Sequence, residues 1–275
     1  MPVKKDIRHI LSISGGKDST ALAIYMHDKY PEIKTEYVFC DTHKECVETY
    51  PFLNRLEGYL GQEITRLEPD MQENAFDYFL KLNNGFLPSR SARWCTKNLK
   101  IKPFERFVGD QQTKLYIAIR ADENRKGYIS TKPNIAPVYP FIDDGITKAD
   151  VFNILCESGV ELPSFYDYRH RSGCYFCFFQ TKEEWVGLLE THPDLFELAK
   201  QYEKPEIGFN WVEGGESLTD IEQPERIAQI KAKAETRRQQ AKKRRMATPV
   251  SLQEQWGGIN PDRLGEDDGC DICHL

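Results

Sequence analysis

Two adjacent glycines stand where an apolar strand should turn into a helix, in the segment Ser14-Gly15-Gly16-Lys17-Asp18-Ser19. Residues 8–14 are apolar enough for a buried strand, and residues 19–30 place apolar side chains at helical spacing. Two glycines let the backbone turn tightly and approach a ligand closely. The amides of the turn and the dipole of the helix then favour an anion. The segment therefore predicts a site for a phosphate-like group.

Strands and helices alternate over the first 120 residues. We expect strands at 8–14, 35–40, 63–67 and 115–120, with helices at 19–30, 47–59, 76–82 and 100–107. This alternation is typical of an α/β fold, a Rossmann-like doubly wound parallel sheet, in which ligands bind at the carboxyl ends of the strands. Three polar segments fall at predicted strand ends, namely residues 14–19, 41–42 and 120–123.

The C-terminal part is expected to be helical. Thr147 with Asp150 and Thr181 with Glu184 resemble capping boxes, and we predict one division at residue 205, with residues 1–205 binding nucleotide. Residues 206–275 should form a helical basic segment and a tail that contains Cys270 and Cys273.

The basic segment spans residues 225–245. It holds nine Lys and Arg residues and two Glu residues, a local charge of +7 in a chain whose net charge is −6. Such a segment could contact a nucleic-acid backbone, or it could be a solvated helix.

The glycine motif differs in spacing from the ordinary P-loop and resembles that of the PP-loop ATP pyrophosphatases, Ser-Gly-Gly-x-Asp-Ser. The resemblance implies an adenine nucleotide alpha hydrolase-like fold that binds ATP and Mg²⁺. It implies that Ser14, Gly15, Gly16, Lys17, Asp18 and Ser19 hold the pyrophosphate, with Lys17, Asp18 and Ser19 also taking part in catalysis.

Further segments resemble the phosphoadenosine phosphosulfate (PAPS) reductase family over residues 8–180. Cys40-Asp41-Thr42 with Glu48-Thr49-Tyr50 resembles an Asp-Thr-Gly…Glu-Thr-Tyr segment in which His43 replaces the glycine. The segment from Arg93 to Pro103 and the segment from Ile119 to Arg125 also resemble segments of that family. The resemblance implies Arg120 as a catalytic residue and Asp41, Arg93, Lys100 and Arg125 as nucleotide-binding residues. Asp41 could equally be a turn-capping residue.

Two departures favour a particular branch. The phosphate loop keeps the complete pyrophosphatase form, and Trp94 precedes Cys95 where iron–sulfur adenylyl-sulfate reductases have a cysteine pair. In both features the chain resembles the DndC-like and SspD-like proteins of DNA phosphorothioation. We therefore expect an enzyme that adenylates an acceptor for sulfur transfer, with a cysteine desulfurase as sulfur donor.

Alternatives stay open for the chemical identity of the acceptor and for the activity of the chain. DNA is the favoured acceptor, ahead of tRNA, and a small molecule stays open. The alternative activities are a PAPS or adenylyl-sulfate reductase and a regulatory or defence module that binds nucleotide without turnover.

The sequence has no apolar run of membrane-spanning length and no signal-peptide apolar region after Met1, which favours a cytoplasmic protein without membrane partners. In that setting its eight cysteines favour reduced thiols, metal ligands or redox centres over a disulfide framework. Cys174 and Cys177 form one Cys-x-x-Cys pair, and Cys270 and Cys273 form another. Relatives with this pattern carry a [4Fe-4S] cluster, so Cys95, Cys174, Cys177 and either Cys270 or Cys273 are its expected ligands. Zinc on the same ligands and free redox thiols are the alternatives.

Overall fold

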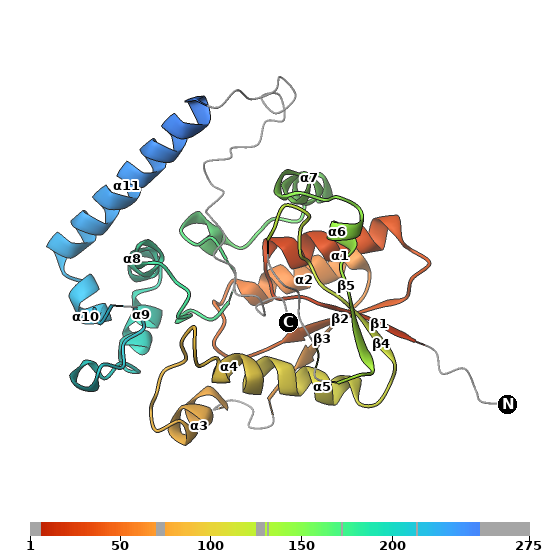
Figure 1. Ribbon diagram of the computed structural model, residues 1–275, viewed down its shortest axis with the longest axis horizontal. Helices are drawn as coiled ribbons and strands as arrows, with labels where there is room; N and C mark the ends of the chain where they lie inside the picture. The colour runs from red at the N-terminus through yellow and green to blue at the C-terminus, as the bar shows by residue number, and fades with distance from the viewer. Residues whose placement is uncertain are drawn as a thin grey trace.

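A computed structural model gives the arrangement of the chain and describes residues 7–69, 75–124, 130, 132–171, 173–212 and 214–247. Five parallel strands form one sheet in the order β3-β2-β1-β4-β5 (Figure 1). The strands are β1 (Arg8–Ser12), β2 (Thr35–Cys40), β3 (Ile64–Leu67), β4 (Thr113–Tyr116) and β5 (Ile135–Val138). The predicted doubly wound parallel sheet is therefore confirmed, and its order reverses between β1 and β4.

Alternating side chains of each strand supply both faces of the sheet. Ile10 packs with Val38 and Leu115 in one cluster, whereas Leu11 packs with Tyr116 in another. The second cluster is covered by α1 (Lys17–Lys29), α2 (Thr49–Leu60) and α7 (Lys148–Ser158), and the first by α5 (Lys102–Val108), as Figure 1 shows. Because successive side chains of a strand point to opposite faces, the near-continuous apolar strands require this double cover.

A third cluster holds the helical C-terminal region together. Aromatic side chains at its centre stack closely, with 5.0 Å between the ring centroids of Phe176 and Trp211. The cluster continues to Ile230 and so includes residues on both sides of the division predicted at 205. The helices of this region are α8 (Lys182–Thr191), α9 (Pro193–Lys200), α10 (Leu218–Ile221) and α11 (Pro224–Ala247).

The remaining helices lie around the sheet and the pocket described below. They are α3 (Ala75–Leu82), α4 (Trp94–Thr96) and α6 (Pro140–Asp143), with short 3-10 turns at Ser164–Asp167 and Pro205–Ile207. Between α4 and α5 the chain forms a π-helical turn at Lys97–Ile101, a feature that often marks functional sites.

Two strands differ from the sequence-based expectation. The strand predicted at 115–120 begins earlier and ends at Tyr116, so that Arg120 lies in the following loop. The strand β5 was not predicted, since Pro137 interrupts its pattern. Among the strands of the described residues it pairs only with β4, at the edge of the sheet, where a residue without an amide hydrogen is tolerated.

Both predicted capping boxes are present, at Thr147 with Asp150 and at Thr181 with Glu184. Among the residues described, no helix is both long enough and apolar enough to cross a membrane.

Two helical glycines offer a test of the packing. A Cβ atom at Gly187 in α8 would lie 2.5 Å from Cδ2 of Tyr168, whereas a Cβ at Gly58 in α2 would meet no atom within 4 Å. We expect Gly187→Ala to lower the free energy of unfolding by about 1–3 kcal/mol through overpacking. Gly58→Ala should raise it by up to about 1 kcal/mol, because alanine favours the helix. Urea unfolding measures both, and equal effects of the two substitutions would contradict the close packing of α8 on Tyr168.

Candidate functional site

The loop after β1 has the backbone shape that its glycines predict. Gly15 has a φ of +71°, and a Cβ atom there would lie 3.3 Å from Cγ2 of Thr49 at the start of α2. A side chain at this position would be strained both by its backbone and by its neighbour. Gly16 precedes α1 without a side-chain cap, so the first-turn amides of α1 have no capping side chain. This is the geometry of an anion site at a helix N-terminus.

Side chains of the loop are held in place from both sides. Ser14 and Ser19 share a hydrogen bond of 3.1 Å between their hydroxyls, and both side chains are buried. The Lys17 ammonium lies 4.9 Å from the ring centroid of Tyr166 and 5.4 Å from that of Phe152. The Tyr166 hydroxyl lies 3.5 Å from the carbonyl oxygen of Gly15, to which it donates. The loop is thus supported by an aromatic wall that the sequence alone did not place.

Arg120 joins the two sides of the point where the strand order reverses. It follows β4, and its Nη1 lies 2.9 Å from Oδ1 of Asp18 in the first turn of α1. Nη1 also lies 2.9 Å from Glu123, and Nε lies 3.1 Å from Asp122. The Arg120 residue is 5% exposed, so these carboxylates compensate a charge that is largely removed from water. Two predicted catalytic residues therefore meet directly.

The loop after β2 explains the Asp-Thr…Glu-Thr-Tyr resemblance. Asp41 accepts hydrogen bonds from the His43 amide at 2.8 Å and from the Tyr50 hydroxyl at 3.1 Å. His43 has a φ of +56°, in the left-handed region that favours glycine, which gives a physical reason for the glycine in the family motif. Asp41 thus caps a turn, and its predicted role in binding nucleotide stays a prediction.

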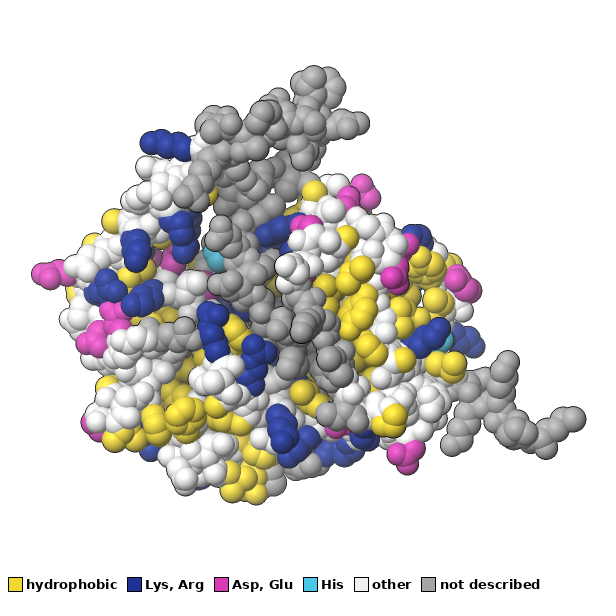
Figure 2. All heavy atoms as spheres, in the orientation of Figure 1, with side chains coloured by type: hydrophobic (Ala, Val, Ile, Leu, Met, Phe, Trp, Pro, Cys, Tyr) yellow, Lys and Arg dark blue, Asp and Glu magenta, His cyan; other side chains and the backbone are white. Residues whose placement is uncertain are grey.

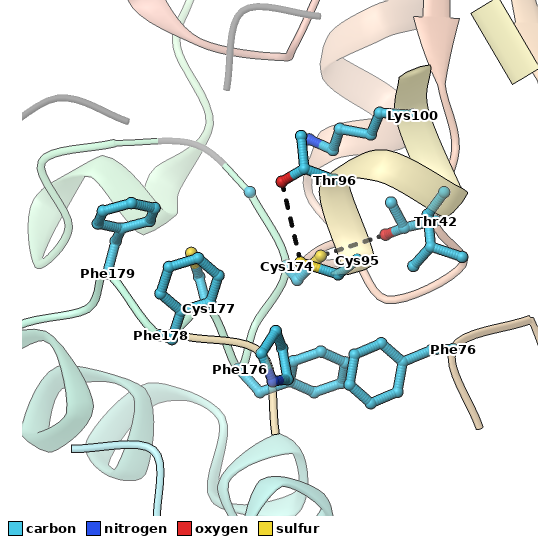
Figure 3. A pocket seen from close by; sticks show the side chains of 13 residues that line it. Thr42, Phe76, Cys95, Thr96, Lys100, Cys174, Phe176, Cys177, Phe178 and Phe179 are labelled. Atoms are coloured by element: carbon cyan, nitrogen blue, oxygen red, sulfur yellow. Dashed lines mark hydrogen bonds between the residues drawn. The ribbon is translucent and has the colours of Figure 1, made fainter. Parts of the chain in front are cut away.

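Three of the expected cysteine ligands line one pocket. Cys95, Cys174 and Cys177 border it together with Thr42 and Lys100, and aromatic side chains form much of the remaining wall (Figure 3). None of the six cysteines in the described residues forms a disulfide.

Buried groups surround Cys174. The Thr42 hydroxyl lies 3.2 Å from its sulfur and donates to Glu45 at 2.9 Å, while the Cys174 thiol lies 3.8 Å from the same carboxylate oxygen. A backbone bridge pairs Glu45 with Cys174, and the Tyr175 amide donates to the Lys44 carbonyl at 2.9 Å. The loop after β2 therefore contacts the phosphate loop at one end and the cysteine pocket at the other.

Burial dominates the acidity of these groups. It raises the pKa of Cys95 to about 11, with the charge of Cys177 adding to the rise, and it raises the pKa of Cys174 well above its ordinary value. Burial also raises the pKa of Glu45, against the opposing charge of Lys100. Thiols in this setting stay protonated at neutral pH until a cation or a metal centre stabilises the thiolate.

Arg169 fixes the turn that carries the cysteine pair. This side chain is 1% exposed, and its guanidinium donates to the Gly173 carbonyl at 3.3 Å, the Cys174 carbonyl at 3.1 Å and the Cys46 sulfur at 3.1 Å. A buried guanidinium with fixed geometry can hold several backbone oxygens at once. The turn from Gly173 to Cys177 is thereby fixed against the loop after β2.

The other predicted site residues have different outcomes. Lys100 lines the cysteine pocket, and the Arg93 guanidinium lies 5.2 Å from the ring centroid of Phe179. Arg125, Cys270 and Cys273 lie outside the described residues. Within the described part of the chain, no three His, Cys, Asp or Glu side chains are gathered so that they could hold a metal ion, and the cluster ligands stay a prediction.

Glu45, Tyr166 and Arg169 are neighbours of the site that were not among the predicted site residues. Glu45 lies four residues after Asp41 and belongs to none of the motifs recognised in the sequence. It approaches Cys174 through tertiary contacts. Tyr166 and Arg169 stand in a run that contains Phe165, Tyr168 and Arg171, and its aromatic and basic composition does not tell where the run lies in the fold.

Two curated proteins of one archaeon are similar to this chain in sequence. The chain is 24% identical over 236 residues to the uncharacterized protein MJ0066 of Methanocaldococcus jannaschii, covering 78% of this chain and 45% of that protein. It is 24% identical over 197 residues to the uncharacterized protein MJ0973 of the same organism, covering 67% and 45% respectively. The chain thus spans less than half the length of these curated relatives.

A crystal structure of PAPS reductase from Candida auris, in complex with phosphate, matches with a TM-score of 0.48 and 15% identity, covering 62% of this chain and 82% of that one. Residues 8–179 match the phosphoadenosine phosphosulfate reductase domain family, and they contain the glycine loop, Arg120 and the Cys174–Cys177 pair. The chain therefore belongs to the phosphoadenosine phosphosulfate reductase domain family.

Proposed function

We propose that this chain is a PP-loop ATP pyrophosphatase that adenylates an acceptor for sulfur transfer, with DNA as the favoured acceptor. The observation that carries the proposal is the complete Ser14–Ser19 loop at the carboxyl edge of the sheet, with Asp18 held by Arg120 from the other side of the strand-order reversal. Open α/β sheets bind their ligands at this point. A family member whose substrate is already an adenylate does not need a complete pyrophosphate loop.

The first step requires positioning and charge neutralisation. An acceptor oxygen forms a bond to the α-phosphorus of ATP, the bond to the bridging oxygen breaks, and pyrophosphate leaves with that electron pair. Amides of the glycine turn, Lys17 and a Mg²⁺ ion would carry the negative charge of the leaving group. Asp18 and Ser19 would orient the loop and the metal, and Arg120 would hold Asp18 in place.

The second step replaces AMP by sulfur. The outer sulfur of a persulfide on a cysteine desulfurase would attack the acceptor phosphorus that carries the adenylated oxygen, and the bond between that phosphorus and that oxygen would break, so that AMP leaves with the oxygen and its electron pair. A thiol reductant would then cleave the remaining S–S bond. The cysteine pocket lies against the loop after β2, whose Thr42 and Glu45 contact it, and this position supports a role for its thiols in sulfur transfer.

The three thiols that line the pocket support an iron–sulfur cluster as the proposed cofactor. Cys95, Cys174 and Cys177 supply three thiols, and Cys270 or Cys273 would supply the fourth. A bound cluster would poise or carry sulfur. The chain's own residues position it, since Arg169 holds the Cys174 turn and Thr42 contacts the Cys174 sulfur. Zinc on the same ligands is the alternative that metal analysis separates.

A second candidate is a PAPS or adenylyl-sulfate reductase, which the family match favours. It would form sulfite from a sulfated adenylate with a thiol reductant and would not need ATP. A module that binds nucleotide without turnover would release no pyrophosphate.

The Asp18–Arg120 pair generates the first functional prediction. Asp18→Ala should reduce pyrophosphate release from ATP by about 100-fold or more, because the loop loses the group that orients it, a loss comparable to removing a transition-state contact. The matched control is Asp122→Ala, which removes another carboxylate partner of Arg120, 3.1 Å from Nε and outside the loop. That variant should stay within about tenfold of the unaltered protein, as expected for a half-exposed ion pair.

Pyrophosphate is measured by a coupled phosphate assay, and circular dichroism confirms that both variants are folded. Full activity of a folded Asp18→Ala protein would refute the role of the loop. Equal losses in both variants would instead assign the effect to Arg120.

The cysteine pocket generates the second functional prediction. Anaerobically purified protein should show the broad visible absorption of a thiolate-ligated cluster and contain about four irons per chain. Cys174→Ser should lose most of the iron, whereas Cys156→Ser should keep it, because Cys156 is an exposed thiol on α7 that does not line the pocket. Iron, sulfide and zinc analysis measures both. Zinc in place of iron, or equal metal content in both variants, would rule out the cluster assignment.

A further inference from the structure

The inner half of α11, residues 224–236, belongs to the helical C-terminal region. Ile230 and Ala234 are buried, and Ile230 is part of the apolar cluster that also contains side chains of α8. Lys231 pairs with Glu190 of α8 at 2.6 Å. Apolar contacts and an acidic partner therefore account for this part of the helix.

The outer half of α11, residues 237–245, differs from the inner half in its charge. Six of these nine residues are Lys or Arg, and none is Asp or Glu. Glu183 of α8 pairs with both Arg237 and Arg238, whose side chains are 65% and 53% exposed. Ion pairs at such exposed positions are weak, and one carboxylate shared by two arginines leaves the outer half with a net positive charge.

Two lysines of the outer half are not engaged by the rest of the described chain. Lys242 and Lys243 are exposed, and neither forms a hydrogen bond or an ion pair with a residue that the structure describes. Figure 1 shows the C-terminal turns of α11 extending beyond α8, and Figure 2 shows Lys and Arg side chains gathered over the region of these two helices. Arg, Lys, Gln and Ala are good helix formers, which keeps this projecting segment helical.

Helix stability does not account for the charge of the outer half. Cations near a helix C-terminus interact favourably with the helix dipole, but this effect is confined to about the last turn. Lys233 and Arg237 stand four residues apart, as do Arg238 and Lys242, and like charges at this spacing destabilise a helix. Helices that face only solvent usually alternate the sign of their charges. A segment with a single sign of charge instead suits an anionic partner.

The charge density of the outer half is similar to that of a nucleic-acid backbone. Nine helical residues rise about 13 Å, so six cations give one positive charge per about 2 Å, and duplex DNA carries one negative charge per about 1.7 Å. A helix that lies on a lipid surface needs an apolar face beside its basic one. Residues 237–245 contain no side chain more apolar than Ala241. The residue types therefore favour phosphodiesters over a membrane.

We propose that the outer half of α11 binds the phosphodiester backbone of the nucleic-acid acceptor and so forms a docking surface on the helical C-terminal region. This inference rests on the proposed function for the identity of the acceptor, and it adds the surface and the chemistry by which the acceptor is held. Phosphate contacts position a protein on a duplex without reading its bases. Binding should therefore be independent of base sequence and should weaken steeply with salt.

The test measures the binding of a short fluorescein-labelled DNA duplex to the full chain by anisotropy, without ATP, over a range of salt concentrations. Lys242→Gln/Lys243→Gln should weaken binding about tenfold or more at low salt. It should also reduce the slope of log K against log salt by about two, because each lost phosphate contact removes about 0.9. Glutamine favours a helix about as well as lysine, so circular dichroism should show unchanged helix content.

The matched control is Lys34→Gln/Lys114→Gln, which removes the same charge at exposed positions near the amino ends of β2 and β4. This control should bind the duplex like the unaltered protein. Lys242→Arg/Lys243→Arg keeps the charge of the outer half and should bind like the unaltered protein as well. Unchanged affinity and salt slope in Lys242→Gln/Lys243→Gln would overturn the proposal, and so would equal weakening in the control.

Other anionic partners are outcomes of the same assay. Polyglutamate that displaces the labelled duplex as effectively as unlabelled duplex, at equal charge, would indicate an acidic protein as the partner and overturn the proposal. Binding to phosphatidylserine vesicles without binding to the duplex would indicate a membrane surface and overturn it as well.

Failure of this proposal and failure of the proposed function are distinguishable. Pyrophosphate release reports on the ATP loop, whereas duplex binding without ATP reports on α11. Duplex bound through Lys242 and Lys243 without pyrophosphate release from ATP would support the docking surface and refute the pyrophosphatase. Pyrophosphate release together with unchanged duplex binding in the glutamine variant would support the pyrophosphatase and overturn the docking surface.

Discussion

The pairing of β1 with β4 is the constraint on which the site depends. β1 pairs with β2 on one side and with β4 on the other, so the chain fills one half of the sheet and then crosses to the opposite side of β1. The loops that follow β1 and β4 therefore leave the sheet as neighbours at its carboxyl edge. The Ser14–Ser19 loop follows β1, and Arg120, which follows β4, reaches Asp18 from the neighbouring strand end. A change in strand order would separate these two residues, although both lie within single, recognisable motifs.

The loop after β2 lies between the phosphate loop and the cysteine pocket. Its carboxyl end leads into α2, where Thr49 packs close to Gly15 of the phosphate loop and the Tyr50 hydroxyl donates to Asp41. Its centre pairs with the cysteine turn through Glu45. One short segment between β2 and α2 therefore connects the phosphate loop with the cysteine turn through packed side chains and hydrogen bonds.

The sequence specified the nucleotide half more fully than the cysteine half, for a physical reason. Consecutive apolar residues in a strand, such as Ile10 and Leu11, require a sheet that is covered on both faces, and glycines at a strand end indicate a tight turn. The covered sheet and the turn therefore both follow from the local sequence pattern. β5 could not be predicted from the sequence because it contains Pro137, and proline is excluded from central strands. The order of the strands shows that β5 lies at the edge of the sheet, where proline is tolerated. Glu45 carries no local signal. Its position next to Cys174 arises from packing between segments about 130 residues apart, which periodicity cannot reveal.

The buried charge of Arg169 bears on what the cysteine pocket can hold. Its guanidinium donates to two carbonyls and one sulfur, its Nε has no hydrogen-bond partner among the residues that the structure describes, and burial opposes its charge. Neutral partners compensate a buried cation only in part, and an uncompensated one costs several kcal/mol. Attraction to Cys46, Glu184 and Cys177 nevertheless raises the pKa of Arg169, so the guanidinium is charged although it is buried. The same attraction lowers the pKa of the Cys46 thiol, but burial has the larger effect and the pKa of Cys46 is raised. Arg169 therefore holds the cysteine turn as a fixed cation, and the buried thiols stay protonated until a metal centre or a further cation stabilises the thiolate.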